Sequence, residues 1–503
     1  MEIILAGMNI DKTLLDEHIA VLRKTLENLE DSEKSSDITT TIQELLDRNN
    51  LTPETLSAAY ARISRDPRPV NQLREDARIQ VGKARRSNRN IIFGLGHSSV
   101  AEHAVFNLDI LGVSRLLSEI LQSHRLCSFT EKSQRYIRLD QDYYVPEPIR
   151  QSIINKEFNQ FVKDRFNDYR ILTELIEKDL NHYPESAAED ARYVLPLCTT
   201  TQMGMTLNAR NLEMLLQQAA SSTNAEFNEF GNRLFSIIDG VAPSIIKYTQ
   251  ASSRKIDMEN AVKSLVLKHF ISARLAQPKP AESVRLLFWT PDGDRLVAGA
   301  LLSRLGIALP QELDSSQHDY PPDLLRQIFL EIFRHMKPWD SAPREFEYAD
   351  FLFEINLSAA AFAQLKRHRM ATITAGDYDF DLPIAIPPVL RETRGESILK
   401  NASEESRELI QKISLISSES IPYAVLSCHR RRVLLKTNAR ELIHLSRLRE
   451  DEHAQWDIRE CISTMVHLAR EKLPGCLLPA CGKHAFENYR KELSLNSFDS
   501  PLN

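Results

Sequence analysis

One pattern occurs twice in this chain, and the repetition limits the folds that the chain can adopt. The first copy contains Ser123-His124-Arg125, and the second contains Arg367-His368-Arg369, 244 positions later. Two further pairs occur in the same order, at spacings of 245 and 230 positions: Glu102 with Glu347, and Asn208-Ala209-Arg210 with Asn438-Ala439-Arg440. Matches that keep their order along a chain indicate an internal duplication. We therefore expect two copies of one domain.

Composition excludes several classes of protein. The 503 residues carry a net charge of −6, which argues against a general nucleic-acid binder, although an anionic small ligand needs only local arginines. No apolar run approaches the roughly 18 residues that span a bilayer, so no membrane association is expected. The six cysteines are sparse, and their spacings, including Cys476, Cys481 and His484, fit no disulfide or zinc pattern well. We expect reduced thiols in a cytoplasmic protein without a metal site.

Apolar spacing predicts the same elements in each half. Helical periodicity over 113–121 leads into His124, and the same periodicity over 357–368 leads into the second copy. Strands are predicted at 3–5, 104–110, 284–289 and 351–355. The predicted fold class is α+β, with two tandem repeats of a helix-rich domain that has a small sheet. Linker-like composition places the domains at 1–250 and 283–503, with a linker at 251–282.

Polar side chains on apolar helix faces mark candidate binding positions in the second half. Asn438, Leu442, Leu445 and Arg449 share one helical face, which His453 and Trp456 are expected to continue. An amide and a guanidinium beside an apolar strip suit a flat heterocycle with polar edges, but a charged Arg–Glu network on the helix would give the same pattern. Gln364 and His368 lie on another apolar stripe, where buried polar groups need partners. Either they satisfy each other or a ligand does.

The first half has a short segment rich in hydrogen-bonding side chains. Glu131, Ser133 and Arg135 alternate with Lys132 and Gln134. Hydroxyl, amide and guanidinium donors suit a phosphate, and the carboxylate suits a sugar hydroxyl or a ring N–H. A solvated turn is the alternative interpretation of this segment.

These motifs resemble those of flavin-dependent thymidylate synthases. The segment 124–136 is similar to the family's Arg-His-Arg-x7-Ser signature, 96–103 to the segment that precedes the signature, and 438–456 to its C-terminal helix. The resemblance covers most of both halves in the right order. It implies binding of FAD, deoxyuridylate (dUMP) and methylene-tetrahydrofolate, with NADPH as reductant and thymidylate as product. It also implies active sites between subunits, so this chain looks like two fused family subunits.

The resemblance assigns a role to each matching position. Arg449 is implied as the catalytic group, which stabilises negative charge on the pyrimidine. The residues implied for dUMP are Glu131, Lys132, Ser133, Gln134, Arg135, Arg192, Gln364 and Arg367. Those implied for FAD are His97, Ser99, His124, Arg125, His368, Arg369, Asn438, Arg440 and His444. Fused subunits further imply a homodimer that reproduces the family's four-subunit arrangement.

Each half departs from the family where the other half keeps the pattern. Ser123 and Ala219 stand in the first half where the family has arginines, whereas the second half has Arg367 and Arg449. In the second half, Ala375, Asp377, Asp379 and Phe380 replace the signature Glu, Ser, Arg and Tyr. Two carboxylates there would repel a phosphate dianion. We therefore expect one composite site per chain.

Two other interpretations remain. The split motifs also fit a flavin- or nucleotide-binding protein that has lost the reaction, although the simultaneous presence of Arg135 and Arg449 argues against decay. A helical interaction scaffold is disfavoured by the net charge and by the buried polar spacing.

Overall fold

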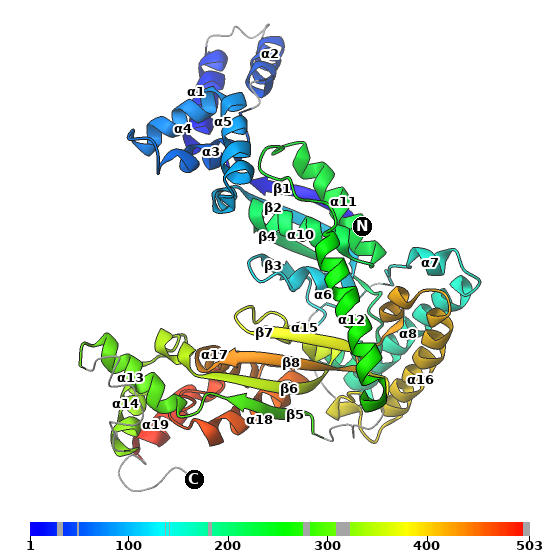
Figure 1. Cartoon of the computed structure of the whole chain (residues 1–503). Helices are drawn as coiled ribbons and strands as arrows, with labels where there is room; N and C mark the ends of the chain where they lie inside the picture. The colour runs from blue at the N-terminus through cyan, green and yellow to red at the C-terminus, as the bar shows by residue number, and fades with distance from the viewer. Residues whose placement is uncertain are drawn as a thin grey trace. The chain divides into compact units, whose positions relative to one another are not determined.

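The chain folds into two compact units that do not coincide with the two sequence repeats (Figure 1). The computed structural model describes residues 1–27, 34–47, 50–135, 137–139, 141–179, 184–274, 282–307 and 322–495. Unit 1 comprises 1–132, 142–147 and 199–277, and unit 2 comprises 133–141, 148–198 and 278–503. A segment of the first repeat therefore belongs to the same compact unit as the second repeat.

Each unit contains a four-stranded antiparallel sheet of the same topology. Unit 1 has the order β1-β2-β4-β3, with β1 (Glu2–Met8), β2 (Val105–Ser114), β3 (Ser128–Glu131) and β4 (Thr200–Asn208). Unit 2 has the order β5-β6-β8-β7, with β5 (Val284–Trp289), β6 (Asp350–Ser358), β7 (Thr372–Tyr378) and β8 (Arg430–Asn438). The matching topology confirms the predicted α+β class with two repeats.

Helices cover these sheets and extend beyond them. Those of unit 1 are α1 (Lys12–Glu27), α2 (Lys34–Asp47), α3 (Glu54–Arg62), α4 (Val70–Ile79), α5 (Val81–Asn88), η1 (Arg89–Gly94), η2 (Ser98–His103), α6 (Arg115–Gln122), α10 (Ala209–Ser221), α11 (Ala225–Asp239) and α12 (Ser253–Arg274). The short α7 (Glu147–Arg150) lies at the boundary between the units. Buried side chains of the sheet, α10 and α11 form the core of unit 1.

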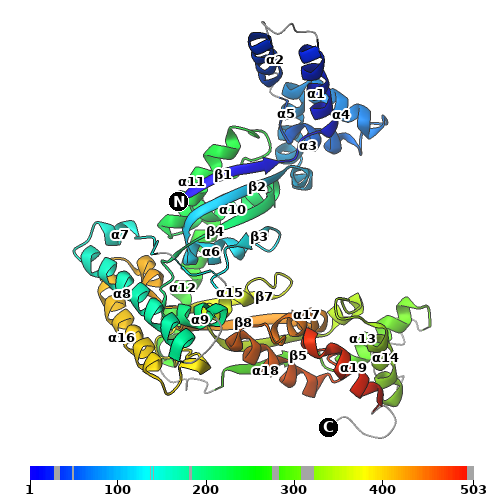
Figure 2. The same ribbon diagram turned by 180° about the vertical axis from the view of Figure 1, so that it is seen from behind.

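Unit 2 combines helices from both repeats. The first repeat contributes α8 (Asn155–Glu174), η3 (Leu175–Asp179), α9 (Pro184–Ala191) and η4 (Arg192–Val194). The second repeat contributes α13 (Gly293–Arg304), α14 (Pro322–His335), η6 (Arg344–Tyr348), α15 (Ala359–Leu365), η7 (Pro388–Leu390), α16 (Arg394–Ser414), η8 (Ser418–Ala424), α17 (Ala439–Arg449), α18 (Trp456–Lys472), η9 (Lys483–Ala485) and α19 (Phe486–Leu495). Figure 2 shows α8 and α16, which come from different repeats, packed side by side.

The join between the repeats in unit 2 is itself symmetric. Pro196 bridges Leu426 in antiparallel fashion, and these two positions are 230 apart, the same spacing as the matched Asn-Ala-Arg motifs. On either side, the Leu197 amide donates to the Val425 carbonyl and the Ser427 amide donates to the Leu195 carbonyl, each at 2.9 Å. Equivalent residues therefore pair across a local pseudo-twofold axis, which fixes this piece of the first repeat onto the second.

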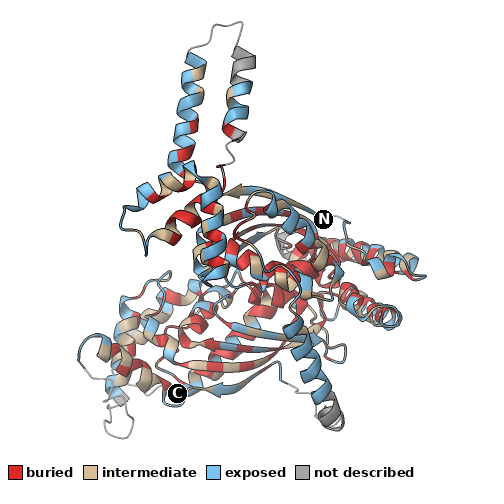
Figure 3. Cartoon of the chain, turned by 45° about the horizontal axis from the view of Figure 1, so that its top comes forward, coloured by how far each residue is buried: buried red, intermediate tan, exposed pale blue. Residues whose placement is uncertain are grey.

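The same buried cap follows the second strand in each repeat. Ser114 ends β2 and accepts a hydrogen bond from the Leu117 amide, as Ser358 does from the Ala361 amide after β6. The hydroxyl of Ser114 donates to Glu226 at the start of α11, and that of Ser358 donates to Asp457 at the start of α18. A serine N-cap satisfies orphan amides of the helix. The carboxylate then ties the cap to α11 in the first repeat and to α18 in the second, and all four side chains are buried. Figure 3 shows the buried residues in red.

Several predicted boundaries differ in the structure. Val113 lies in β2 and not in the helix, because strand pairing continues to Ser114 before the serine cap starts α6. The face of α17 does not continue to His453 and Trp456, because the helix ends at Arg449 and α18 starts after the Gln455 cap. Within the predicted linker 251–282, the structure has the helix α12 (Ser253–Arg274), and residues 275–281 lie outside the described residues.

Candidate functional site

Unit 2 brings arginines from both repeats close to one another. Arg135 of the first repeat forms an ion pair with Glu189 (Nε to Oε1, 2.6 Å) and donates to the His453 carbonyl at 2.6 Å. Burial, together with the charges of Arg367 and Arg135, lowers the pKa of Arg449 to about 10. Like charges disfavour each other's ionised form. Arg135 and Arg367 lower the pKa of Arg449 because positive charge is concentrated in this cluster. An anionic ligand would therefore bind favourably there.

Arg449 is held by a histidine and a backbone carbonyl, and the histidine in turn faces a carboxylate. Its Nε donates to His368 Nε2 at 3.0 Å, and its Nη2 donates to the Gln364 carbonyl at 3.3 Å. Burial lowers the pKa of His368, so the ring is neutral near pH 7. Since Nε2 accepts from Arg449, the ring proton lies on Nδ1, which faces Glu441 Oε1 at 3.4 Å. The sequence predictions missed Glu441, although its position on the helix face that carries Arg440 and His444 was available.

The Gln364 side chain is buried without a hydrogen-bonding partner. Gln364 is 6% exposed, and neither its Oε1 nor its Nε2 bonds to any residue that the structure describes. An unsatisfied buried amide costs roughly 1–3 kcal/mol for each lost hydrogen bond. The sequence left two alternatives, in which Gln364 pairs with His368 or with a ligand. His368 bonds instead to Arg449 and faces Glu441, so the amide of Gln364 remains available to a ligand.

A second group of polar residues from the first repeat lies beside Arg135. Arg192 is buried in η4, and Asp190 precedes it and accepts from Trp456 Nε1 at 3.1 Å. Tyr193 stacks on Trp456 with ring centroids 5.7 Å apart, and its hydroxyl donates to Asp457 at 3.3 Å. Burial and the neighbouring Glu189 raise the pKa of Asp190 to about 7, against the opposing effects of Trp456, Arg192 and Arg135. This network locks the first-repeat segment onto α18.

A pocket of about 390 Å³ lies against one face of α17. Two of the positions predicted for FAD line it, Arg440 and His444, together with Trp339, Met370, Leu448 and Lys483. Arg440 donates to the Ala342 carbonyl at 2.8 Å and pairs with Glu347 at 3.0 Å. His444 contacts His368 edge-on, with ring centroids 5.7 Å apart. The pocket and the arginine cluster are therefore linked through two histidines, His444 and His368.

The remaining second-repeat positions are Asn438 and Arg369, predicted for FAD, and Arg367, predicted for dUMP. Asn438 caps α17 by accepting from the Glu441 amide, so its side-chain oxygen is used within the helix. Arg367 and Arg369 are exposed on the turn that follows α15. Ser133 accepts from the Arg135 amide at 3.2 Å, and Gln134 is buried between them.

The other predicted site residues belong to unit 1. His97, Ser99 and Arg125 are exposed, whereas His124 is buried with its Nδ1 3.0 Å from the Leu121 carbonyl. Lys132, at the end of unit 1, donates its backbone amide to the Gln202 carbonyl at 3.0 Å.

Glu131 is occupied within unit 1. Its carboxylate side chain is 1% exposed and accepts from Arg115, from Ser118 at 2.9 Å and from Gln122 at 2.8 Å. These donors come from α6, and the sequence predictions did not include them. The Glu131 carboxylate therefore anchors the end of β3 to α6.

The second copy of the signature has a different structure. There β7 continues to Tyr378, whereas β3 ends at Glu131. Asp379 pairs with Arg432 at 3.6 Å, and the Arg431 guanidinium lies between the rings of Phe362 and Tyr378. This extended strand therefore has Ala375 and Asp377 at the positions of Glu131 and Ser133 in the first copy.

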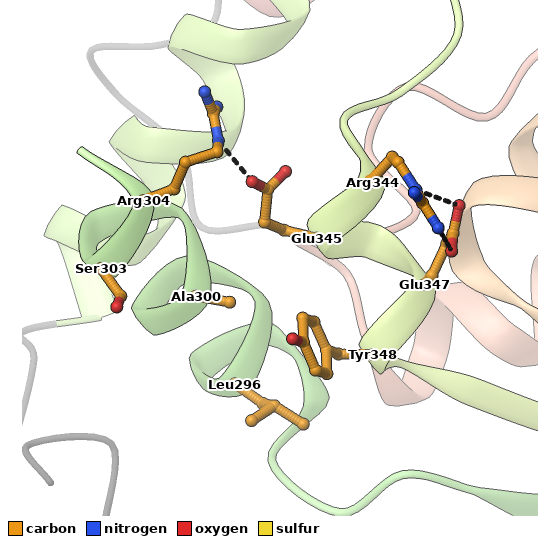
Figure 4. Close-up of a pocket in the computed structure, with 8 residues that line it drawn as sticks. All are labelled: Leu296, Ala300, Ser303, Arg304, Arg344, Glu345, Glu347 and Tyr348. Carbon is orange, nitrogen blue, oxygen red and sulfur yellow. Dashed lines mark hydrogen bonds and ion pairs between the residues drawn. The ribbon is translucent and has the colours of Figure 1, made fainter. Parts of the chain in front are cut away.

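A larger pocket of about 630 Å³ lies between α13 and η6, and it contains none of the predicted residues (Figure 4). Its charged lining is internally paired, because Arg344 bonds to Glu347 at 3.2 Å and Arg304 pairs with Glu345. Among the described residues, no group of three or more His, Cys, Asp or Glu side chains could hold a metal ion. No described helix has the length and hydropathy needed to span a membrane.

The fold and this cluster define a two-repeat α+β protein in which arginines of both repeats lie in one compact unit. The chain belongs to the thymidylate synthase complementing protein family, whose sequence profile matches residues 44–244 and 285–475. A flavin-dependent thymidylate synthase from Clostridium tetani is 30% identical over 211 residues, which are 40% of this chain and 83% of that protein.

Longer relatives cover both repeats. A UPF0159 protein from Thermoplasma acidophilum is 25% identical over 458 residues, covering 78% of this chain and 88% of its own length. Among solved structures, thymidylate synthase X from Helicobacter pylori with FAD and dUMP is 18% identical, with a TM-score of 0.28. The match covers 49% of this chain and 98% of the Helicobacter pylori chain.

Proposed function

We propose that the chain is a flavin-dependent thymidylate synthase that converts dUMP to dTMP at one composite site per chain. The observation that carries this proposal is the arginine cluster of unit 2. Arg135 comes from the first repeat and bonds to the His453 carbonyl, whereas Arg449 comes from the second repeat and bonds to His368. The charges of Arg367 and Arg135 both lower the pKa of Arg449. Relatives named flavin-dependent thymidylate synthases support the reaction.

The nucleotide would be held by both repeats. Ser133, Gln134, Arg135 and Arg192 supply the hydroxyl, amide and guanidinium donors that suit a phosphate. Gln364 would pair with a polar edge of the pyrimidine, which would satisfy its buried amide. Arg367 adds positive charge at the rim of the same cluster.

Arg449 is the proposed catalytic residue. A preorganised donor stabilises charge that develops in the transition state, and burial strengthens that interaction. Arg449 would donate to the pyrimidine as negative charge develops near N3 and O2. His368 and Glu441 would hold the guanidinium in place, so they act as positioning residues.

FAD fits the residues around α17. The α17 pocket combines an aromatic ring, apolar side chains and cations, which suits a flat ring with attached phosphates. Bound FAD, reduced by NADPH, would supply the hydride, and methylene-tetrahydrofolate would supply the carbon. The chain's own contribution would come from His368, Arg369, Asn438, Arg440 and His444, which orient the cofactor beside the nucleotide.

The unit 1 positions enter the proposal through the family pattern. His97, Ser99, His124 and Arg125 match family flavin positions, and Glu131 and Lys132 match nucleotide positions. We propose that Glu131 holds the end of β3 against α6, since its carboxylate already accepts hydrogen bonds from Ser118 and Gln122. A homodimer of this chain would reproduce the family's four-subunit arrangement.

The test is thymidylate production from dUMP, methylene-tetrahydrofolate and NADPH, with FAD added and air excluded. We expect product, and equilibrium dialysis should give one dUMP per chain. Two equivalent dUMP sites per chain would contradict the composite site but not the reaction. If FAD binds and is reduced by NADPH without product, the chain is instead a flavin- and nucleotide-binding protein without this activity.

A further inference from the structure

The geometry points to Trp339 as a stacking platform for a flat ring of FAD bound in the α17 pocket. This inference rests on the proposed function, because the pocket also contains Arg440 and His444. Trp339 is 74% exposed, although tryptophan is the largest apolar side chain and is buried for most of its area in typical folds. Position 339 lies outside the segments 96–103, 124–136 and 438–456 that resemble the family, so the assignment comes from the structure.

The turn that carries Trp339 is held firmly. The Lys337 amide donates to Asp340 Oδ2 at 2.9 Å, and the Asp340 amide donates to the Lys337 carbonyl at 3.0 Å. Buried Arg447 of α17 donates to the Pro338 carbonyl at 2.6 Å. The exposed indole is therefore presented by a turn that is fixed to the wall of the pocket, and stacking a ligand on it would require little ordering of the chain.

The surroundings of Trp339 suit a ring with attached anionic groups. The Lys337 ammonium lies 5.6 Å from the indole centroid. Met370 (65% exposed) and Leu448 (42% exposed) also line the pocket and provide apolar contacts for a ring. Lys483 lines the same pocket and is exposed, so it can reach a phosphate of the cofactor. A ligand ring stacked on Trp339 would cover apolar surface that the fold leaves in water.

The experiment measures FAD affinity of the purified full chain by isothermal titration, for wild type, Trp339→Ala and Trp339→Phe. The matched control is Trp289→Phe, because Trp289 of β5 also has a lysine over its ring, Lys472 at 4.9 Å, and lies outside the α17 pocket. Stacking on an aromatic side chain is worth roughly 10- to 100-fold in affinity. We expect that loss for Trp339→Ala, a smaller loss for Trp339→Phe and no change for Trp289→Phe.

Further titrations identify the ring. Riboflavin contains only the isoalloxazine and ADP only the adenine, so the ligand whose affinity falls in Trp339→Ala carries the ring that stacks. Unchanged FAD affinity in Trp339→Ala would overturn the inference and leave the proposed function intact. No FAD binding by wild type would instead overturn the proposed function.

Two other outcomes would also overturn the stacking assignment. If light scattering shows that Trp339→Ala changes the oligomeric state, Trp339 belongs to a subunit interface. If methylene-tetrahydrofolate loses affinity while FAD does not, the platform serves the folate.

Discussion

The two repeats build the same sheet and the same serine caps, but the helix that follows the last strand ends differently in each. In the second repeat, α17 ends at Arg449, which bonds to His368. In the first repeat, position 219 of α10 is a buried alanine, and a Cβ placed on Gly231 would lie 2.6 Å from its Cβ. The close approach of α10 and α11 leaves no space for an arginine. The first repeat therefore buries an alanine in the helix packing at the position where the second repeat has the proposed catalytic arginine.

In the signature segment, the first repeat keeps the family pattern and the second repeat has lost it. Glu131 is held in the first repeat by Arg115, Ser118 and Gln122. At the positions 244 further along, the second repeat has Ala375 in place of the carboxylate and Ala359, Phe362 and Lys366 in place of the donors. The whole network is thus present in one copy and absent from the other. Each repeat keeps residues of the proposed site that the other has lost, and Arg135 of the first repeat lies in unit 2 together with Arg449 of the second.

Replacing Arg449 should give the largest effect, because it removes the donor that only the second repeat has. We expect Arg449→Ala to lower the rate of thymidylate formation about 10²–10³-fold, with FAD reduction by NADPH still measurable. The matched control is Arg210→Ala, since Arg210 pairs with Glu102 as Arg440 pairs with Glu347. A rate near that of wild type for Arg449→Ala would place the catalytic group elsewhere.

Breaking the Glu131 network should destabilise the protein, because the pair is buried. Removing one partner of a buried ion pair typically costs about 3–5 kcal/mol. We expect a loss of that size in the free energy of unfolding for Glu131→Ala, measured by denaturant titration. The double variant Arg115→Ala/Glu131→Ala should lose less than the sum of the single variants. Additive losses would mean that the two side chains are not coupled.

The pH dependence of stability should depend on Asp190, whose equivalent 230 positions later is Ser420. Burial raises the pKa of Asp190 to about 7 in the folded chain, so the folded state binds the proton more tightly than the unfolded state. The stability that this proton contributes to the folded state is fully present below about pH 4. It is lost as the pH rises through 7, by up to about 1.4 kcal/mol per pH unit.

Asp190→Asn should therefore have a flatter profile of melting temperature against pH than wild type between pH 5 and 7. Parallel profiles for the two proteins would show that Asp190 does not carry the effect. We expect this change to be smaller than that in Glu131→Ala, because Asp190 is only partly buried.

The sequence was sufficient for the class of fold and for β1, β2, β5 and β6, but it did not predict β3, β4, β7 or β8. Alternating and periodic apolar residues predicted β5 at its observed bounds and β6 to within a few residues, because those side chains must reach a core. Prediction of helix ends from the sequence was less accurate. Ser114 and Gln455 start new helices, and a cap of one residue interrupts a pattern that periodicity alone extends across it.

The candidate site likewise combines features that the sequence predicts with features that only the structure shows. The sequence by itself determined which residue types are available and that the two repeats are complementary, because these follow from position and chemistry along one chain. Only the tertiary structure decided that 133–141 and 148–198 join the second repeat, that Glu441 orients His368, and that the Gln364 amide has no partner among the described residues. Those facts depend on contacts between residues up to hundreds of positions apart, and hydrophobic periodicity constrains only the face that each element buries.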